Sequence, residues 1–307
     1  MIYTVTLNPS IDYVVFLEDY RTGALNRSTA TAKFAGGKGI NVSRVLNTLG
    51  VSSVALGFTG GFPGRFIEHQ LESAGIQTDF IAVDEDTRIN IKLKSHEETE
   101  INASGPTISE AQLQSLLQRI EQTTSEDIVV LAGSVPTSLP QSTYVDIAEI
   151  VRKTGAQLVV DAEKGLMEGI LPYRPLFVKP NQHELEEMFD VQIDSDQDVV
   201  AYATKLIERG AQAVLVSLGG AGAIYVDDTQ AFKVNAPKGR VVNTVGAGDS
   251  TVAGMLASLV EQLPIEARLK LAIASGSATA FNDDLAERQT IQSLQSNVSV
   301  TPINKEG

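Results

Sequence analysis

Short apolar runs alternate with longer amphipathic stretches along most of the chain. Runs rich in β-branched residues predict buried strands at 2–7, 54–58, 127–131, 157–160, 176–178 and 213–216. Helical spacing of apolar positions predicts helices at 38–49, 64–73, 109–122, 140–153, 182–189 and 196–209, then two long helices near 249–262 and 265–281. This alternation predicts an α/β fold, with a mostly parallel sheet covered on both faces in a three-layer α/β/α core.

Two segments, at about residues 11–35 and 87–103, interrupt this alternation and contain no convincing helix. Their residues predict strands instead, at 13–17, 29–34, 89–94 and 99–102. Because both segments fall between core elements, the four strands can form one small sheet beside the core, and we expect a β-sheet lid over a functional site. No linker or repeat divides the chain, so a single domain is expected over residues 1–307.

Composition narrows the classes of protein that remain. Apolar residues make up 43% of the chain and charged residues 20%, enough for a large folded core. The net charge of −14 disfavours nucleic acid and anionic membranes as partners. The absence of cysteine excludes disulfides, Cys-based zinc sites and thiol nucleophiles. Without a basic leader or a run of about 18 apolar residues, the expected location is cytoplasmic.

Several common catalytic motifs are missing from the sequence. It contains no G-x-x-x-x-G-K-[ST] loop and no G-x-S-x-G elbow, and no G-x-G-x-x-G follows the first strand, which disfavours an NAD-binding oxidoreductase. The three histidines, His69, His96 and His183, are far apart and are expected at the surface. The acidic run at 194–198 starts like a calcium loop but lacks its glycine and glutamate, so it predicts a helix start.

The segment N-T-V-G-A-G-D-S at 243–250 is the most informative motif. Strand-like residues precede it and a long apolar helix follows, so its glycines bring bare N–H groups to a helix N-terminus. Such an end attracts phosphate oxygens, and Asp249 in the same turn is placed to accept a proton from a hydroxyl. Alone, the motif also fits an ordinary glycine-rich turn with Asp249 as its cap.

Three further motifs add polar groups at the ends of predicted elements. G-G-K-G-I-N at 36–41 enters a helix with a cation and an amide. K-P-N-Q-H-E at 179–184 places Asn181 and Glu184 on one helix face, where they suit either the water shell of Mg²⁺ or helix capping. S-L-G-G-A-G at 217–222 predicts a backbone-exposed turn after a strand. Each of these motifs is weak by itself.

In this order, G-G-K-G-I-N and N-T-V-G-A-G-D-S resemble the two signatures of the PfkB carbohydrate kinases, a family of the ribokinase-like superfamily. The resemblance covers nearly the whole chain and includes the motifs N-P-S-I-D, T-R-I-N, A-G-S-V-P, K-P-N-x-x-E and S-L-G-G-x-G. It implies a ribokinase-like core with a small β-sheet lid, and ATP and Mg²⁺ as cofactors. The ordered set of motifs is far more specific than any one of them.

The resemblance also implies a role for individual residues. Asp249 would be the catalytic base, in a catalytic turn that begins at Gly246, and the amides of Ala247, Gly248 and Asp249 would form the anion hole. The residues implied for the sugar phosphate are Asp12, Arg27, Gly37, Lys38, Asn41, Arg88 and Ser134. Those implied for the nucleotide are Lys179, Ser217, Gly219, Gly222 and Asn282. Asn181 and Glu184 would hold Mg²⁺ through water.

For the activity, the resemblance implies transfer of phosphate from ATP to D-fructose 1-phosphate, giving fructose 1,6-bisphosphate. Tagatose 6-phosphate and, less well, fructose 6-phosphate are alternative acceptors. A phosphosugar-binding regulator without turnover is the alternative from another class, although the retained Asp249 and N-x-x-E motif argue against it. Because the lid strands should expose a face or an edge, a homodimer joined through the two lids is expected.

Overall fold

The main sheet is parallel through most of its width and antiparallel at one edge. This is a computed structural model that describes residues 1–162 and 164–305. The parallel strands are β1 (Ile2–Thr6), β4 (Ser53–Gly60), β5 (Gln77–Val83), β8 (Ile128–Ala132), β9 (Gln157–Asp161), β10 (Phe177–Val178) and β11 (Ala213–Ser217). The antiparallel edge consists of β12 (Ala223–Asp227), β13 (Ala231–Asn235) and β14 (Ser299–Ile303). The ten strands follow the order β14-β13-β12-β11-β10-β9-β8-β1-β4-β5.

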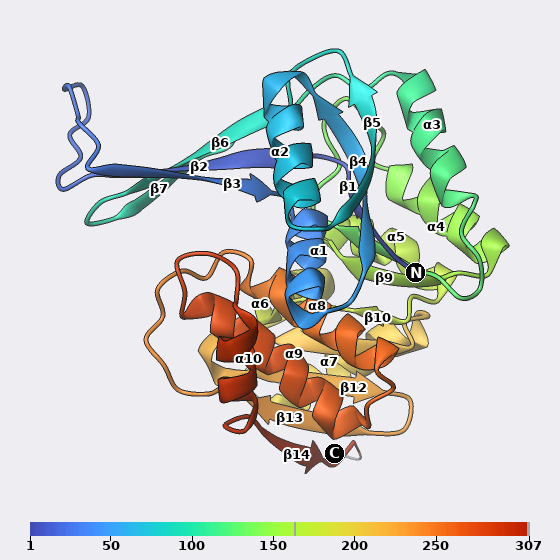
Figure 1. Ribbon diagram of the computed structural model, residues 1–307. Helices are drawn as coiled ribbons and strands as arrows, with labels where there is room; N and C mark the ends of the chain where they lie inside the picture. The colour runs from blue at the N-terminus through green and yellow to red at the C-terminus, as the bar shows by residue number, and fades with distance from the viewer. Residues whose placement is uncertain (163, 306–307) are drawn as a thin grey trace.

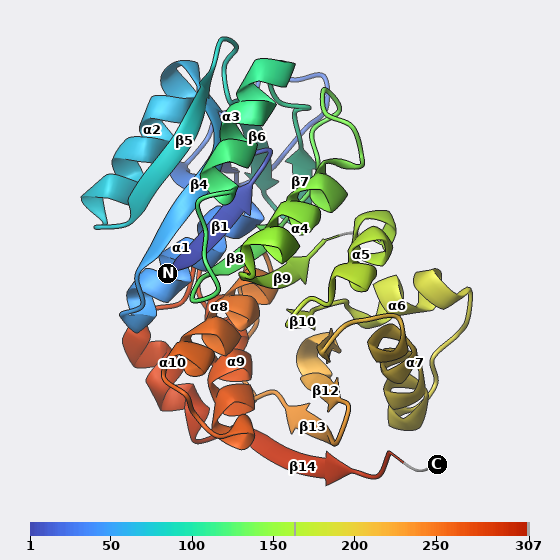
Figure 2. The same cartoon turned by 90° about the vertical axis from the view of Figure 1, so that its right-hand side faces the viewer.

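Helices cover both faces of this sheet, which confirms the predicted three-layer α/β fold (Figure 2). One face carries α3 (Glu110–Ile120), α4 (Thr143–Thr154), α5 (Lys164–Ile170), α6 (Gln182–Phe189) and α7 (Asp196–Glu208), with the short 3₁₀ helix η1 (Leu171–Tyr173). The other carries α1 (Lys38–Leu49), α8 (Ala247–Val260), α9 (Ile265–Ala280) and α10 (Arg288–Gln295). A further helix, α2 (Gly61–Ser73), packs against β4 and β5. In the described part of the chain, no helix has the length and apolar character needed to cross a membrane.

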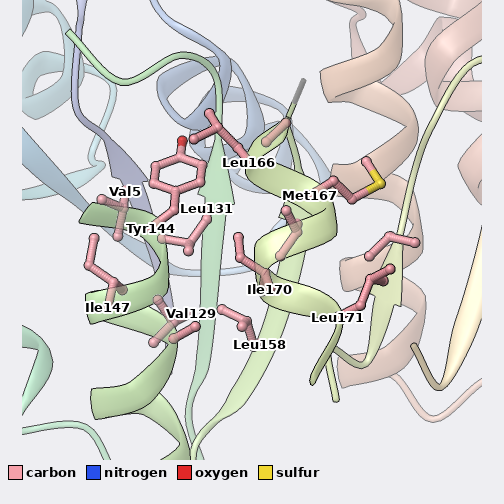
Figure 3. Packing of buried hydrophobic residues seen from close by; sticks show 14 of the residues in the cluster. Val5, Val129, Leu131, Tyr144, Ile147, Leu158, Leu166, Met167, Ile170 and Leu171 are labelled. Atoms are coloured by element: carbon pink, nitrogen blue, oxygen red, sulfur yellow. The ribbon is translucent and has the colours of Figure 1, made fainter. Parts of the chain in front are cut away.

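Alternation along the buried strands decides which residues enter which core. In β8, Val129 and Leu131 face α3–α7, whereas Val130 faces the layer of α1 and α8–α10. Figure 3 shows Leu131 packed beside Tyr144 and Ile147, which lie one helical turn apart on α4. The Tyr144 hydroxyl donates a hydrogen bond to the Gly133 carbonyl at 3.0 Å, so this large ring is buried without an unpaired polar atom.

Capping residues account for the helix ends that the sequence predicted well. α1 ends at Gly50, which takes the left-handed conformation with φ 84°, and both of its bounds match the prediction. The acidic run at 194–198 is a helix start, as predicted, because Ser195 and Asp198 form a capping box. All three histidines are exposed, also as predicted.

The four strands expected in the lid form a separate sheet. They are β2 (Ser10–Phe16), β3 (Ala30–Gly36), β6 (Arg88–Lys94) and β7 (Glu98–Ile101), in the order β3-β2-β6-β7. The sheet projects from the body of the molecule beside α2 (Figure 1). Its base is anchored because Ile11 and Ala35 pack into a cluster with Ile67 and Leu71 of α2.

Candidate active site

A cavity of about 460 Å³ lies where the lid meets the carboxyl ends of the central parallel strands. We call it the lid cavity. The lid contributes Ser10, Asp12, Arg88, Asn90, Lys92 and Glu100 to its lining, and the core contributes Gly37, Lys38, Asn41, Ser134, Asp161, Lys179 and Asp249. The carboxyl ends of parallel strands are the usual binding position in open α/β sheets. Here residues from strands, loops and helices converge on one polar space.

Successive side chains of the lid strands point to opposite faces of the sheet, and the polar ones share one face. Ser10 and Asp12 alternate on β2, and Arg88, Asn90 and Lys92 alternate on β6. Asp12 pairs in register with Asn90 across the parallel β2–β6 ladder, so the two side chains lie on the same face. All of these residues line the lid cavity, whereas the residues between them do not.

The N-terminus of α8 forms the floor of the lid cavity. Gly246 precedes the helix with φ 77°, a conformation that a residue with a side chain rarely adopts, and Gly246, Gly248 and Asp249 of this turn line the cavity. Asp249, in the first turn, is buried and accepts a hydrogen bond from the Asn41 amide at 2.8 Å. Asn41 comes from α1, so the two glycine-rich motifs, far apart in sequence, meet at this carboxylate.

Burial and a neighbouring carboxylate change the proton affinity of Asp249. Removal of the side chain from water disfavours its charged form, and the negative charge of Asp161 adds to this effect. Lys38, Lys179 and the Asn41 hydrogen bond oppose the shift but do not cancel it, and the pKa of Asp249 is raised to about 6. A carboxylate with this pKa is a stronger base than an exposed aspartate and is still ionised at neutral pH.

Asp161 joins two lysines of the site and was missed by sequence reasoning. It is buried at the end of β9, 3.3 Å from the Lys179 ammonium and 3.8 Å from that of Lys38. Its second carboxylate oxygen is buried and has no hydrogen-bond partner in the described part of the chain. The position at the carboxyl end of a buried strand was the available signal, but no local motif marks it.

A second cavity, of about 530 Å³, lies on the other side of the α8 N-terminus. We call it the loop cavity. The turn after β11 lines it with Ser217, Gly219 and Gly222. Loop 236–241 supplies Pro237 and Val241, helix α9 and the residue after it supply Ile273 and Phe281, and α8 adds its first turns. The turn includes the 3₁₀ helix η2 (Gly219–Ala221). Gly248 lines both cavities, so they meet at the first turn of α8.

Lys179, which the resemblance assigned to the nucleotide, lies at the junction of the two cavities. It lines the lid cavity only, and a Cβ added to Gly248 would lie 3.1 Å from its ammonium. Its side chain is buried, with 7% of its surface exposed. The ammonium is therefore fixed beside the helix N-terminus that separates the two cavities.

Three of the predicted residues line neither cavity. Asn282 follows Phe281 of the loop cavity, but its own amide is buried without a hydrogen-bond partner among the described residues. Glu184 lies outside both linings. Arg27 is exposed in the connection between β2 and β3 at the lid tip. Within a single chain, the structure therefore does not bring Asn282, Glu184 or Arg27 to either cavity.

Asn181 and Glu184 cap helix α6. The Asn181 side chain accepts from the Glu184 N–H, and the Glu184 side chain accepts from the Asn181 N–H, both at 2.8 Å. Asn181 also lines the loop cavity. No cluster of three or more His, Cys, Asp or Glu side chains suited to a metal occurs in the described residues. Asn181 is thus both the cap of α6 and a lining residue of the loop cavity.

Arg88 is held by two backbone carbonyls at the base of the lid. Its guanidinium donates to the Asn8 carbonyl at 2.9 Å and to the Ala103 carbonyl at 3.1 Å. Asn8 lies before the first lid strand and Ala103 after the last, so one side chain bridges two of the connections between lid and core. Its Nε is buried without a hydrogen-bond partner in the described chain, and burial lowers the pKa of Arg88.

Sequence and structure comparisons agree with this geometry. Residues 5–288 match the family described as pfkB family carbohydrate kinase. The chain is 48% identical to a 1-phosphofructokinase of Bacillus subtilis, over 98% of this chain and 99% of that protein. It is 36% identical to a D-tagatose-1-phosphate kinase of Bacillus licheniformis, again over 98% and 99%. The structure of Escherichia coli phosphofructokinase-2 in complex with substrates and products matches with a TM-score of 0.92 and 29% identity, covering 96% of this chain and 98% of that one.

The chain therefore belongs to the pfkB family of carbohydrate kinases. It is an enzyme of the carbohydrate kinase type, and its fold is the ribokinase-like α/β fold with a small lid sheet.

Proposed function

We propose that this kinase transfers the γ-phosphoryl group of ATP, with Mg²⁺, to a sugar phosphate, and that D-fructose 1-phosphate is its preferred acceptor. The observation that carries the proposal is the meeting of two cavities at the N-terminus of α8. The lid cavity is polar and charged and suits a phosphorylated sugar. The loop cavity combines bare glycine turns with Ile273, Val241 and Phe281, which suit phosphates and a flat base.

In this assignment Asp249 is the catalytic base. Its carboxylate faces the lid cavity in the turn where the two cavities join, and a pKa of about 6 suits a group that removes a proton at neutral pH. The attacking sugar oxygen would lose its proton to Asp249 as it bonds to the γ-phosphorus, while the bond from that phosphorus to the bridging oxygen breaks and ADP leaves with that oxygen. The Gly248 N–H in the first turn of α8 and the Lys179 ammonium beside it are the donors we propose for the charge on the transferring group.

The residues near the junction fit a hydrated Mg²⁺ ion. The unpartnered buried oxygen of Asp161 is of the type that hard cations and their water ligands prefer, and Asn181 lines the loop cavity within the same region. When bound with ATP, Mg²⁺ supplies charge neutralisation to the phosphate oxygens. Asp161, Asn181 and, through water, Glu184 are the residues we propose for it.

Arg88 is the residue we propose for the phosphate already on the acceptor. The lysines that line the lid cavity each lie close to a carboxylate: Lys92 lies close to Asp12, and Lys38 and Lys179 lie close to Asp161. Arg88 instead bonds two neutral carbonyls and retains donors, so its positive charge has no carboxylate within ion-pair distance among the described residues. A planar guanidinium with free donors suits phosphate oxygens. Lys38 and Ser134 line the same cavity and are further candidates.

The choice of fructose 1-phosphate is supported by the similarity to a 1-phosphofructokinase at 48% identity, against 36% for relatives described as D-tagatose-1-phosphate and tagatose-6-phosphate kinases. The lining residues of the lid cavity suit any of these sugar phosphates, so the sequence similarity decides between them. An enzyme that consumes ATP and a sugar phosphate is expected in the cytoplasm, where both are formed.

We further propose that two copies join through their lids. The lid face opposite the cavity carries Tyr13, Val15, Ile91 and Leu93, all only partly buried, and 54% of Ile101 is exposed. An apolar face of this kind on a projecting sheet is usually covered. Sedimentation at micromolar concentration should show a dimer, and a monomer would contradict this proposal.

The substrate assignment is tested by measuring ADP release with ATP and Mg²⁺ against four acceptors: fructose 1-phosphate, tagatose 6-phosphate, fructose 6-phosphate and unphosphorylated fructose. We expect kcat/KM to be highest for fructose 1-phosphate. A preference for another sugar phosphate would correct the acceptor and keep the mechanism. Tight binding of one sugar phosphate without turnover of any would instead support a regulator.

A further inference from the structure

A buried lysine on the lid, Lys92, has no part in the mechanism above. It lies on β6 with only 7% of its surface exposed, and it lines the lid cavity. Its ammonium lies 3.3 Å from Asp12 on β2 and 3.7 Å from Glu100 on β7. Burying a lysine is unfavourable unless its charge is matched, so these two carboxylates are the reason that this position tolerates one.

The surroundings of Asp12 show what the lysine contributes. One carboxylate oxygen of Asp12 accepts hydrogen bonds from the Ser10 hydroxyl at 2.9 Å and the Asn90 amide at 3.2 Å. The other oxygen faces Lys92. Behind the carboxylate, a Cβ on Gly36 would lie within 2.9 Å of the Asp12 oxygens, so only glycine leaves room for this orientation. The ammonium is thus the charged contact that completes the fixed position of Asp12.

The second contact of Lys92 joins the inner lid to its outer edge. Lys92 and Glu100 are directly paired in register across the antiparallel β6–β7 ladder, and β7 is the edge strand of the lid. Glu100 is more exposed than Asp12, with 39% of its side chain accessible against 16%. Without Lys92, two carboxylates would face the same space with no cation between them, and their repulsion would displace Asp12 or the edge strand.

We propose that Lys92 is a positioning residue, which holds the ionised Asp12 in the orientation that binds the sugar hydroxyls and does not itself bind the substrate phosphate. Its charge is already matched by two carboxylates, in contrast to that of Arg88. This inference rests on the proposed function, because it takes Asp12 as a ligand of the sugar. It adds a residue that acts on substrate affinity through Asp12.

The main test compares Lys92→Met with Lys94→Met. Lys94 lies two positions further along β6 and forms the equivalent cross-strand pair with Glu98 at 3.9 Å, but it has no contact with Asp12, so it is a matched control. We expect Lys92→Met to raise the sugar-phosphate KM at least about tenfold, as for truncation of one partner of a buried charge pair. Saturating kcat and the KM for ATP should change little, and Lys94→Met should leave all three near wild type.

Two further variants separate positioning from a general effect on folding. Lys92→Arg keeps the charge and should restore much of the affinity. If Lys92 acts through Asp12, Lys92→Met should add nothing to Asp12→Asn, and the double variant should match Asp12→Asn alone. This second comparison remains informative if the single Lys92→Met variant fails to fold, because Asp12→Asn removes the unmatched charge.

The alternative is that Lys92 itself binds the phosphate of the substrate. Inorganic phosphate, used as a competitor of the sugar phosphate at saturating ATP, tests this alternative. Its inhibition constant should be unchanged in Lys92→Met and raised in Arg88→Ala. The inference is overturned by a sugar-phosphate KM within twofold of wild type in Lys92→Met, by an equal effect of Lys94→Met, by additivity with Asp12→Asn, or by a raised phosphate inhibition constant.

The unmodified chain is measured first, with the sugar phosphate that it binds best, as both KM and a calorimetric Kd. Absence of turnover with every sugar phosphate would refute the proposed function, yet the Kd values would still decide the role of Lys92. Normal turnover with a wild-type KM in Lys92→Met would refute only the inference about the lysine.

Discussion

The two cavities that meet at Gly248 are built from different kinds of residue. The described lining of the lid cavity contains four carboxylates and four cations, and most of them form pairs across elements. The loop cavity has Lys238 as the sole ionisable side chain in its described lining, and is otherwise made of glycines, small polar residues and apolar side chains. We infer that the acceptor side selects its ligand by charge and hydrogen bonding, whereas the nucleotide side selects by shape and by exposed backbone.

Of these substitutions, Arg88→Ala should weaken binding of the sugar phosphate in the lid cavity most strongly. Loss of the guanidinium removes a cation of the lid cavity that has no carboxylate within ion-pair distance among the described residues, and it also removes the bridge between Asn8 and Ala103. We expect the sugar-phosphate KM to rise roughly 30- to 100-fold, as for loss of a charged partner, with the KM for ATP nearly unchanged. Steady-state kinetics with each substrate varied in turn would check this, and an unchanged sugar-phosphate KM would place the phosphate elsewhere.

Gly239→Ala should weaken ATP binding in the loop cavity without affecting the sugar phosphate. A Cβ at Gly239 would lie 2.3 Å from the Phe281 ring, so the ring or loop 236–241 must move, and both line the loop cavity. We expect the KM for ATP to rise by up to about tenfold, because overpacking shifts the walls of the cavity. The sugar-phosphate KM should remain near wild type. Equal changes in both KM values would contradict the separation of the two cavities.

The pH profile sharpens the comparison, because it reports the charge balance of the lid cavity. Burial and the charge of Asp161 raise the pKa of Asp249 to about 6, so with Asp249 as the proposed base kcat/KM should fall as pH decreases through that value. Asp161→Asn removes the carboxylate that raises this pKa and leaves Lys38 and Lys179 in place. The acid limb should therefore move to lower pH. The ionisation of the sugar phosphate contributes equally to the profiles of the wild type and of Asp161→Asn. An acid limb at the same pH in both proteins would therefore contradict the role of Asp249 as the base.

Arg27→Ala should have the smallest effect of this series. Arg27 lies at the lid tip, outside the lid cavity of its own chain. We expect the sugar-phosphate KM to change less than about threefold, as is usual for an exposed charge. A rise as large as that in Arg88→Ala would show that the lid tip reaches the bound phosphate, by movement or from a second copy.

Sequence reasoning succeeded where the information is local. Helices α1 and α6 were predicted with correct bounds because Gly50 ends one and Asn181 caps the other. The four lid strands follow from alternation of polar and apolar residues. Lys92 could have been found from the same alternation, since it shares a strand face with Arg88 and Asn90.

The rest depends on contacts between distant segments. The antiparallel strands β12–β14 were not predicted, because their edge position is set by pairing with β11 and not by their own pattern. Asp161 is recognised as a site residue only through its ion pairs with Lys38 and Lys179, which come from two other parts of the chain. The N-x-x-E motif had two physical interpretations, and the capping box shows that helix capping is one of its functions.

The central claim is that acceptor and nucleotide meet at the α8 N-terminus with Asp249 as the base, and Asp249→Asn tests it most directly. The substitution keeps the side chain's shape and its contact with Asn41, so calorimetry should show near wild-type binding of both ATP and the sugar phosphate. We expect kcat to fall by about 10²- to 10⁴-fold, as for loss of a general base. Retention of a tenth or more of the wild-type kcat, with both ligands bound, would contradict the account.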